Sequence, residues 1–334
     1  MSAIVVLHGL IHLLGDGIAW VLAAVLLVVA GVLLAASVRW WWTVGAVAAV
    51  ISQALIVSAW SEAKAGTVAN VVLALAVWQG FAAQGPTSIR ARYRRLAGQQ
   101  LADAAAAAGA PGRGPVVAAE DLRHLPPPVA AYVSACGAVG QPRVQGFRAR
   151  IHGRIRGGPD RPWMPWTGEQ VNTFGTHPSR VFFMDATMLG LPADVLHTYV
   201  GPAARMQVKP ASVFTLIDAA GPEMTRAETV TLLNDLCVLA PAALVDAAIA
   251  WTPIDDHHAR ATFTNAGQTV SAELVFDDDH ELVDFVSDDR LRASADGKSF
   301  TRQRWSTPLG GYREFGTRRL SSAGHGRWHP DATE

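Results

Sequence analysis

The stretch GIAWVLAAVLLVVAGVLLAAS, from Gly17 to Ser37, decides the fold of the N-terminal part of this chain because it contains no charged residue. A helix rises about 1.5 Å per residue and needs about 20 apolar residues to cross the hydrocarbon core of a bilayer. Inside that core the backbone has no water to bond, so it must satisfy its own hydrogen bonds. The stretch therefore predicts a membrane-spanning helix at 17–37.

Three more apolar segments accompany it, and together they predict a bundle of four helices over residues 1–85, at about 3–14, 17–37, 41–60 and 66–84. Tryptophans near the segment ends are typical of the aromatic belt at a membrane interface. The segment 3–14 is short, so it spans the bilayer only if it tilts or the bilayer thins; a surface helix beside three spans is the alternative. We expect a multi-pass protein of the cell (inner or plasma) membrane.

A step in composition marks the end of the bundle. Few residues before residue 86 are charged, although the whole chain has 28 Lys and Arg and 28 Asp and Glu. We therefore divide the remainder into a basic helical stem and linker at 86–124 and a soluble domain at 125–334. The zero net charge gives no sign of a nucleic-acid partner. Cys136 and Cys237 are too few for a disulfide framework.

The basic residues after the last apolar segment predict the orientation of the chain. Arg90, Arg92, Arg94 and Arg95 follow that segment closely. Loops rich in Lys and Arg stay on the cytoplasmic side. With four spans, the N-terminus and the soluble domain are both expected to face the cytoplasm.

Polar side chains inside the bundle are candidate functional residues, because they are costly to bury in lipid without a partner. His8 and His12 are spaced i, i+4 and so share one helix face. They could bind a metal or a haem if Asp16 or Glu62 supplied further ligands. The simpler interpretation is hydrogen bonding between helices, with no metal and no cofactor. The intramembrane candidates are His8, His12, Gln53 and Asn70.

The hydrophobic pattern changes to a period of two in the soluble domain. Apolar and polar positions alternate from Phe147 to Arg156, which predicts a half-buried strand. Further strands are predicted at 170–174, 180–184, 213–217, 259–264, 270–276 and 281–286. A helical segment at 223–250, divided by Pro241, interrupts them. The predicted class is α+β, with a curved antiparallel sheet, or half-barrel, covered by a helix pair.

The first of these strands carries a group of arginines on one face. Guanidinium groups in such a row could bind phosphates, including the headgroups of an anionic leaflet. A solvated outer face is the simpler interpretation. Two nearby tryptophans are expected to pack in the core or to line a concavity. The candidates for ligand or headgroup binding are Arg148, Arg150, Arg154, Arg156, Trp163 and Trp166.

Two short runs contain both aspartate and histidine, Asp255–His258 and Asp277–His280. Both lie beside predicted strands, so turns are a simpler interpretation than a metal site or a weak calcium site. The chain contains no GxSxG, GxxxxGK[ST], HExxH or paired CxxC motif. If the protein is an enzyme, Asp255, His258 or His152 would be its acid–base groups, and its catalytic residues are otherwise unknown.

Several motifs resemble a bacterial membrane-protein family of unknown function. They include Leu7–Gly15 and Ser52–Asn70 in the bundle, and Leu125–Pro126, Gly168–Gln170 and Asp289–Arg290 in the soluble domain. The resemblance implies four N-terminal helices and a soluble domain that is loosely similar to the lipoprotein-carrier half-barrel, whose concavity holds acyl chains. Against that pattern, the connection between the first two helices is short, and a closing strand is expected beyond the sequence given.

These features favour a membrane-anchored protein that binds a lipid or another hydrophobic small molecule in its soluble domain. Its expected partners are the lipid bilayer and that small molecule, with no nucleic acid and no identified protein partner. An enzyme acting on a lipidic substrate is one alternative. A membrane assembly or structural protein, whose helices bind partner helices, is the other.

Overall fold

The computed structural model describes residues 1–15, 17–108, 115–188 and 190–330. Contacts within the chain divide it into two compact units. The first unit comprises Met1–Arg92 and Pro210–Phe214. The second comprises Tyr93–Lys209 and Thr215–Glu334.

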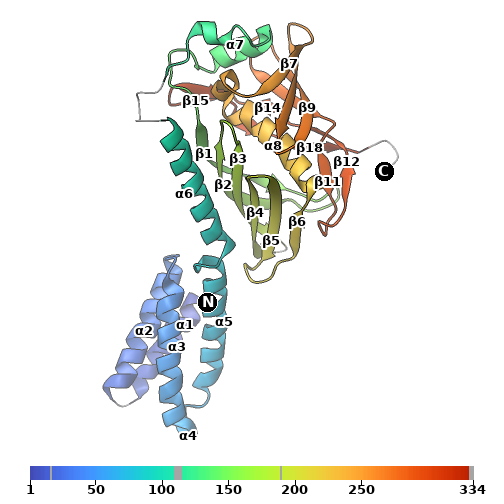
Figure 1. Ribbon diagram of the computed structural model, residues 1–334. Coiled ribbons are helices and arrows are strands. Elements are labelled where there is room, and N and C mark those ends of the chain that lie inside the picture. The colour runs from blue at the N-terminus through green and yellow to red at the C-terminus, as the bar shows by residue number, and fades with distance from the viewer. Residues whose placement is uncertain (16, 109–114, 189, 331–334) are drawn as a thin grey trace. The chain divides into compact units, whose positions relative to one another are not determined.

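The first unit is a helical bundle (Figure 1). Its elements are α1 (Ser2–Ile11), the 3-10 helix η1 (His12–Leu14), α2 (Ile18–Ala35), α3 (Trp41–Ser58), α4 (Trp60–Ala63) and α5 (Gly66–Gln84). Among the described residues, three helical segments are long and apolar enough to cross a membrane, namely α2, α3 and the one that begins at Gly66. Together α1 and η1 form a shorter apolar segment. These lengths support membrane association of the N-terminal unit.

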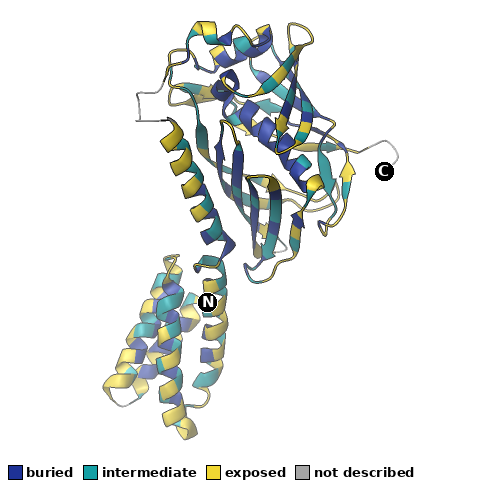
Figure 2. Cartoon of the chain, in the orientation of Figure 1, coloured by how far each residue is buried: buried dark blue, intermediate teal, exposed yellow. Residues whose placement is uncertain are grey.

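Small residues allow the helices of the bundle to approach closely. A Cβ atom at Gly9 of α1 would lie 3.0 Å from the carbonyl oxygen of Ala24 in α2. A Cβ atom at Gly31 of α2 would lie 2.6 Å from Cγ2 of Val6 in α1. Such contacts are typical of helices packed in a membrane, where small residues bring backbones together. Many large apolar residues of the bundle are exposed, where a bilayer would cover them, and Figure 2 shows the exposed residues of these helices in yellow.

The second unit begins with helices and continues into a six-stranded sheet. The helices are α6 (Ile89–Ala108), which belongs to this unit from Tyr93 onward, η2 (Ala119–Leu122) and α7 (Pro127–Ala135). The strands are β1 (Gly146–Ile155), β2 (Met164–Thr173), β3 (Ser179–Met188), β4 (Leu191–Val200), β5 (Ala203–Pro210) and β6 (Ile217–Ala220). They are neighbours in sequence order, as expected for strands joined by short turns. The pairs β1–β2, β2–β3 and β3–β4 are antiparallel.

A second six-stranded sheet has the order β18-β13-β10-β9-β8-β7. Its strands are β7 (Ile249–Pro253), β8 (His258–Asn265), β9 (Gln268–Phe276), β10 (Leu282–Ser287), β13 (Arg304–Ser306) and β18 (Arg327–His329). Smaller two-stranded sheets pair β11 (Leu291–Ala293) with β12 (Phe300–Arg302), β14 (Leu309–Gly310) with β17 (Ala323–Gly324), and β15 (Arg313–Phe315) with β16 (Arg318–Leu320). Neither large sheet closes into a barrel.

Helix α8 (Pro222–Leu239) lies between the two large sheets, and the 3-10 helix η3 (Pro241–Val245) follows it (Figure 1). It is buried along nearly its whole length (Figure 2). Leu233 of α8 shares one hydrophobic core with Leu274 and Phe285 of the second sheet. Because the apolar side of α8 packs on the second sheet, its polar side is left to face the first.

The predicted class is confirmed, since N-terminal helices precede a domain of antiparallel sheets with a helix packed on them. The strand predicted at 213–217 is wrong, because residues 211–214 form a turn and β6 begins only at Ile217. Strands β4 and β5 were not predicted. Pro192 follows the first residue of β4, and Pro202 directly precedes β5. A proline indicates a turn as readily as it indicates the start of a strand.

Candidate functional site

Two carboxylates of α8 point toward the first sheet. Glu228 and Asp235 are two helical turns apart and therefore share one face of α8. Arg180 of β3 binds both: its Nη1 donates to Oε2 of Glu228 at 2.8 Å, and its Nε donates to Oδ2 of Asp235 at 2.7 Å. All three residues are buried. Buried charges need partners of this quality, because their transfer from water is costly.

Neighbouring strands supply the remaining hydrogen bonds of these carboxylates. Oδ2 of Asp235 also accepts from Nε2 of Gln170 at 2.6 Å and from Nδ2 of Asn172 at 3.1 Å. Nδ1 of His197 lies 3.1 Å from Oε1 of Glu228. Strands β2, β3 and β4 thus all contribute a polar side chain to the same face of the sheet. This face is the inner face, because it meets α8.

Both members of the central ion pair stay charged. Burial alone would raise the pKa of Glu228, but the charge of Arg180 and the hydrogen bond with His197 lower that pKa well below its usual value. Burial alone would lower the pKa of Arg180, but Glu228 and Asp235 raise that pKa above its usual value. The charged state of the pair therefore depends on the contacts between its members.

Arg290 supplies a second guanidinium beside α8. Among the described residues, no carboxylate forms an ion pair with it. It follows β10, and its Nη1 donates to the hydroxyl of Thr231 on α8. Its Cζ lies 4.3 Å from the ring centroid of Trp305 and 5.4 Å from that of Trp328. Its Nε is buried and has no hydrogen-bond partner within the described part of the chain. An orphaned buried donor of this type is costly unless an acceptor binds it.

Burial lowers the pKa of Arg290 to about 10, although the charges of Glu228 and Asp235 act in the opposite direction. The group is still charged at neutral pH. We name the whole set the α8 ion cluster; it consists of Arg180, His197, Glu228, Asp235 and Arg290.

An aromatic surface continues the inner face of the first sheet beyond the cluster. Cζ of Arg180 lies 5.0 Å from the ring centroid of Phe182, and the rings of Phe182 and His197 are 5.9 Å apart. The rings of Phe182 and Trp166 are 6.0 Å apart, edge to face. Trp166 and Phe182 are only partly buried. This Trp166/Phe182 patch places apolar surface directly beside charged groups.

The predicted arginine row lies on the opposite face of the first sheet. Side chains alternate along a strand, and Arg150 is paired with Glu169 while Gln170 points inward. Nη2 of Arg148 and Nε of Arg150 bind the two carboxylate oxygens of Glu169 at 2.8 and 3.1 Å. His152 is exposed. These arginines are therefore partly neutralised by an acidic neighbour.

The other two arginines of that row form a separate group. Cζ of Arg154 and of Arg156 lie 4.9 and 4.6 Å from the ring centroid of Trp163, and 47% of the surface of Trp163 is exposed. Cation–π contacts at exposed sites contribute about 0.5–1 kcal/mol. The four arginines thus form two pairs, and their role as headgroup ligands stays a prediction. Trp163 and Trp166 lie in different surroundings.

The structure brings the intramembrane candidates together. Nε2 of His8 lies 3.0 Å from Oδ1 of Asn70, and Nε2 of His12 lies 2.8 Å from the hydroxyl of Ser52. The Ser52 hydroxyl donates to Oδ1 of Asn70 at 3.0 Å, and Nδ2 of Asn70 donates to Oε1 of Gln53 at 3.0 Å. These bonds connect α1 and η1 to α3 and α5, as expected for polar side chains between membrane helices.

The two runs with aspartate and histidine lie in the connections between strands, and His258 is the first residue of β8. Oδ1 of Asp255 accepts from the backbone N–H of His257 at 2.9 Å and lies 2.7 Å from Nδ1 of His258. Oδ1 of Asp277 accepts from two backbone N–H groups of its own loop. In the described ranges, no group of three or more His, Cys, Asp or Glu could hold a metal ion. Asp16, considered above as a ligand, lies outside them.

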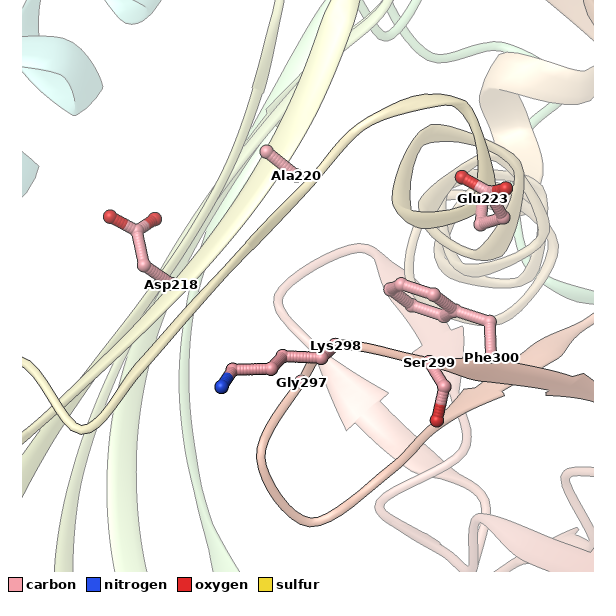
Figure 3. A pocket seen from close by; sticks show the side chains of 7 residues that line it. All are labelled: Asp218, Ala220, Glu223, Gly297, Lys298, Ser299 and Phe300. Atoms are coloured by element: carbon pink, nitrogen blue, oxygen red, sulfur yellow. The ribbon is translucent and has the colours of Figure 1, made fainter.

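An open polar pocket lies at the start of α8 (Figure 3). Its volume is about 400 Å³, and it is lined by Asp218, Ala220, Glu223, Gly297, Lys298, Ser299 and Phe300. Figure 3 shows that these side chains point in different directions, and Phe300 is the one aromatic ring among them. Asp218 is bound to Arg205 at 2.6 Å. A lining of this polarity does not suit an acyl chain.

A family model matches residues 115–334. The chain belongs to DUF6544, a family of unknown function. No curated protein and no solved structure matches the chain. The expected membership of an uncharacterised family is therefore confirmed, whereas the resemblance to the lipoprotein-carrier fold is not.

Sequence reasoning found Trp166 in the DUF6544 domain and quoted Arg290 within a family motif, but it missed the other members of the α8 ion cluster. One signal was present, because Glu228 and Asp235 are seven residues apart and therefore share one face of a helix. A polar face on a helix is usually exposed to solvent, so the sequence does not indicate that this face is buried. Its burial became evident only with Arg180, which lies 48 and 55 residues away along the chain.

Proposed function

We propose that this protein is a membrane-anchored binding protein whose DUF6544 domain holds an amphipathic ligand with an acidic head. The apolar part of the ligand would lie on the Trp166/Phe182 patch, and its head would lie beside the α8 ion cluster. The observation that carries the proposal is the buried Nε of Arg290, which has no partner among the described residues. A carboxylate or phosphate oxygen is the acceptor that a guanidinium binds most strongly.

The charged and apolar parts of the candidate site are close enough to serve one ligand. Arg290 is near enough to Arg180 and Glu228 for their charges to act on it, and Arg180 in turn stacks on Phe182. Each hydrogen bond to a charged group contributes about 1.5–3 kcal/mol, and each Å² of apolar surface removed from water adds about 25 cal/mol. A long-chain carboxylic acid from the surrounding bilayer has both parts.

Binding can be tested with the full-length protein in lipid nanodiscs. The probe is cis-parinaric acid, a fluorescent long-chain carboxylate, which is excited by energy transfer from tryptophan. We expect Arg290→Gln and Trp166→Leu each to weaken binding at least about tenfold, which is about 1.4 kcal/mol. Arg150→Gln is the matched control, because Arg150 lies on the outer face, and it should bind as wild type.

Equal affinity in wild type and in both inner-face variants would overturn the proposal, and so would the absence of saturable binding to wild type. Thermal unfolding of each variant must accompany the titration, because Arg290 also contacts Thr231, Trp305 and Trp328. Trp166→Leu removes none of those contacts and so keeps the test informative if Arg290→Gln fails to fold.

An enzyme acting on a lipidic substrate is the second candidate, and the contact between His197 and Glu228 favours it. A carboxylate at Nδ1 orients an imidazole and leaves Nε2 to accept a proton. The test is release of fatty acid from monoacylglycerol in mixed micelles, with His197→Gln as the variant. Absence of product from wild type, or equal release from His197→Gln, would exclude this role for His197.

We propose further that the chain crosses the membrane several times and places the DUF6544 domain in the cytoplasm. The arginines after α5 support this orientation. Cys136 and Cys237 are buried, so a single cysteine introduced by His177→Cys, at an exposed position, can report accessibility. A membrane-impermeant maleimide should label it only after the cells are permeabilised; labelling of intact cells would reverse the orientation.

A further inference from the structure

The hydrogen bonds of the intramembrane cluster can be counted proton by proton. Nδ1 of His12 lies 3.0 Å from the main-chain carbonyl oxygen of His8. A carbonyl only accepts, so this nitrogen carries a proton. At the other end, Nδ2 of Asn70 donates to Gln53, whose Nε2 donates to the hydroxyl of Thr67 at 3.2 Å. Asn70 therefore presents its carbonyl oxygen to the centre of the cluster.

Ser52 stands between two acceptors with one proton to donate. Its hydroxyl oxygen lies 2.8 Å from Nε2 of His12 and 3.0 Å from Oδ1 of Asn70. If the hydroxyl donates to Asn70, then His12 must donate from Nε2 to the hydroxyl oxygen. His12 then carries protons on both ring nitrogens and is an imidazolium cation, and every contact has its proton.

The same heavy atoms also fit a neutral His12. If the amides of Asn70 and Gln53 turn by about 180°, which exchanges groups of nearly equal size, Nδ2 of Asn70 donates to Ser52 and to Nε2 of His8. The Ser52 hydroxyl then donates to Nε2 of His12, which needs no proton of its own. His8 carries its single proton on Nδ1 in this form. The two forms differ by one proton on His12, by the tautomer of His8, whose single proton moves from Nε2 to Nδ1 by exchange with water, by the direction of the Ser52 and Thr67 hydroxyls, and by two amide rotations, without movement of a helix.

We propose that this cluster is a reversible proton-binding site within the membrane bundle, with His12 as the group that takes up the proton. The proton comes from water and returns to it, and no bond between heavy atoms changes. The rings that face His12 are those of His8, at 4.7 Å between centroids, and Trp20, at 5.3 Å. An indole near an imidazolium stabilises the cation.

Neither imidazole bonds a charged side chain in the described part of residues 1–85. The charged side chains described there are those of Arg39, Glu62 and Lys64, and none of them has a hydrogen bond or an ion pair with His8 or His12. A cation in this place depends on neutral acceptors alone. The chain from His12 through Ser52 to Asn70 is therefore what makes the protonated form possible.

The test is a pH titration of the full-length protein in lipid bilayers by solid-state NMR, with ¹⁵N-labelled histidine. The His12 signals are identified by their loss in His12→Gln. We expect both ring nitrogens of His12 to become protonated as the pH is lowered. In Ser52→Ala the Nε2–H group loses its acceptor, so the second proton should not bind. Ser58→Ala, which removes a hydroxyl of α3 that donates to the main-chain oxygen of Leu55 at 2.7 Å outside the cluster, should titrate as wild type.

Two outcomes would overturn the proposal. One is a wild-type His12 that keeps a single proton at a pH at which the exposed His177 and His325 are doubly protonated. The other is a Ser52→Ala protein that takes up the proton as wild type does. Helical circular dichroism of each variant shows whether the bundle is intact, and the wild-type titration stands without any variant.

Discussion

Replacement of Arg180 by methionine tests how strongly the α8 ion cluster stabilises the DUF6544 domain. Methionine is apolar and unbranched, so it leaves Glu228 and Asp235 buried without their cation. Removal of one partner from a buried ion pair costs about 3–5 kcal/mol. In a domain of roughly 200 residues each kcal/mol lowers the unfolding midpoint by about 2–4 °C. We therefore expect the midpoint to fall by about 6–20 °C at neutral pH.

The loss should depend on pH in a defined direction. In wild type the pKa of Glu228 is lowered, so the ionised side chain stabilises the folded domain at pH values above the usual pKa of glutamate. This stabilisation is lost as the pH falls through the pKa that Glu228 has in the folded protein. Without Arg180, burial dominates and raises the pKa of Glu228. The destabilisation is then complete above the raised value and is relieved as the pH falls through it. The deficit of the variant should therefore be smaller at about pH 5 than at about pH 7.

The assay is thermal unfolding of the full-length protein in detergent, followed by tryptophan fluorescence. Arg150→Met is the control, because the side chain of Arg150 is 80% exposed and its bond to Glu169 is a surface ion pair. Such pairs contribute about 0–1 kcal/mol. A fall of less than about 2 °C for Arg180→Met, or a deficit as large at low pH as at neutral pH, would refute the reasoning.

Cys136 and Cys237 should react with iodoacetamide far more slowly in the folded protein than after unfolding. The reason is that burial raises the pKa of Cys136 to about 12 and raises the pKa of Cys237 as well. Rapid labelling of the folded protein, counted by mass spectrometry, would contradict this. Tyr132→Phe should lower the free energy of unfolding by about 1 kcal/mol, because the hydroxyl donates to the main-chain oxygen of Cys237 at 2.8 Å; an unchanged midpoint in chemical denaturation would argue against that bond. Gly9→Leu should force α1 away from α2 and lower the thermal stability, because a Cβ atom at Gly9 would lie 3.0 Å from a backbone oxygen. Gly98→Leu is the control, because a Cβ atom at Gly98 would meet nothing within 4 Å. Equal thermal stability of the two variants would show that the helices do not pack as described.

The helices of the bundle and the class of the soluble domain could be predicted because their signals are local. A run without charge, such as 17–37, needs no partner to indicate a span. Alternation of apolar and polar residues at 259–264 and 270–276 predicted β8 and β9 for the same reason. The error at 213–217 shows the limit, because apolar residues also occur in turns.

The two candidate sites also differ in whether their signal is local in the sequence. His8, His12, Gln53 and Asn70 were found from the sequence, because a polar residue in an apolar segment stands out. Of the α8 ion cluster only Arg290 was quoted, within a family motif, because polar residues are common in soluble domains and the sequence does not distinguish a buried polar residue from an exposed one.

Membrane association therefore follows from the amino-acid sequence alone, since the length and apolarity of a segment such as Gly17–Ser37 are properties of that segment. The tertiary structure decided which polar groups meet. It placed Ser52 between His12 and Asn70, and it placed Arg180 between two carboxylates of α8. These contacts join residues distant along the chain, and their geometry depends on how helices and strands pack, which no local pattern encodes.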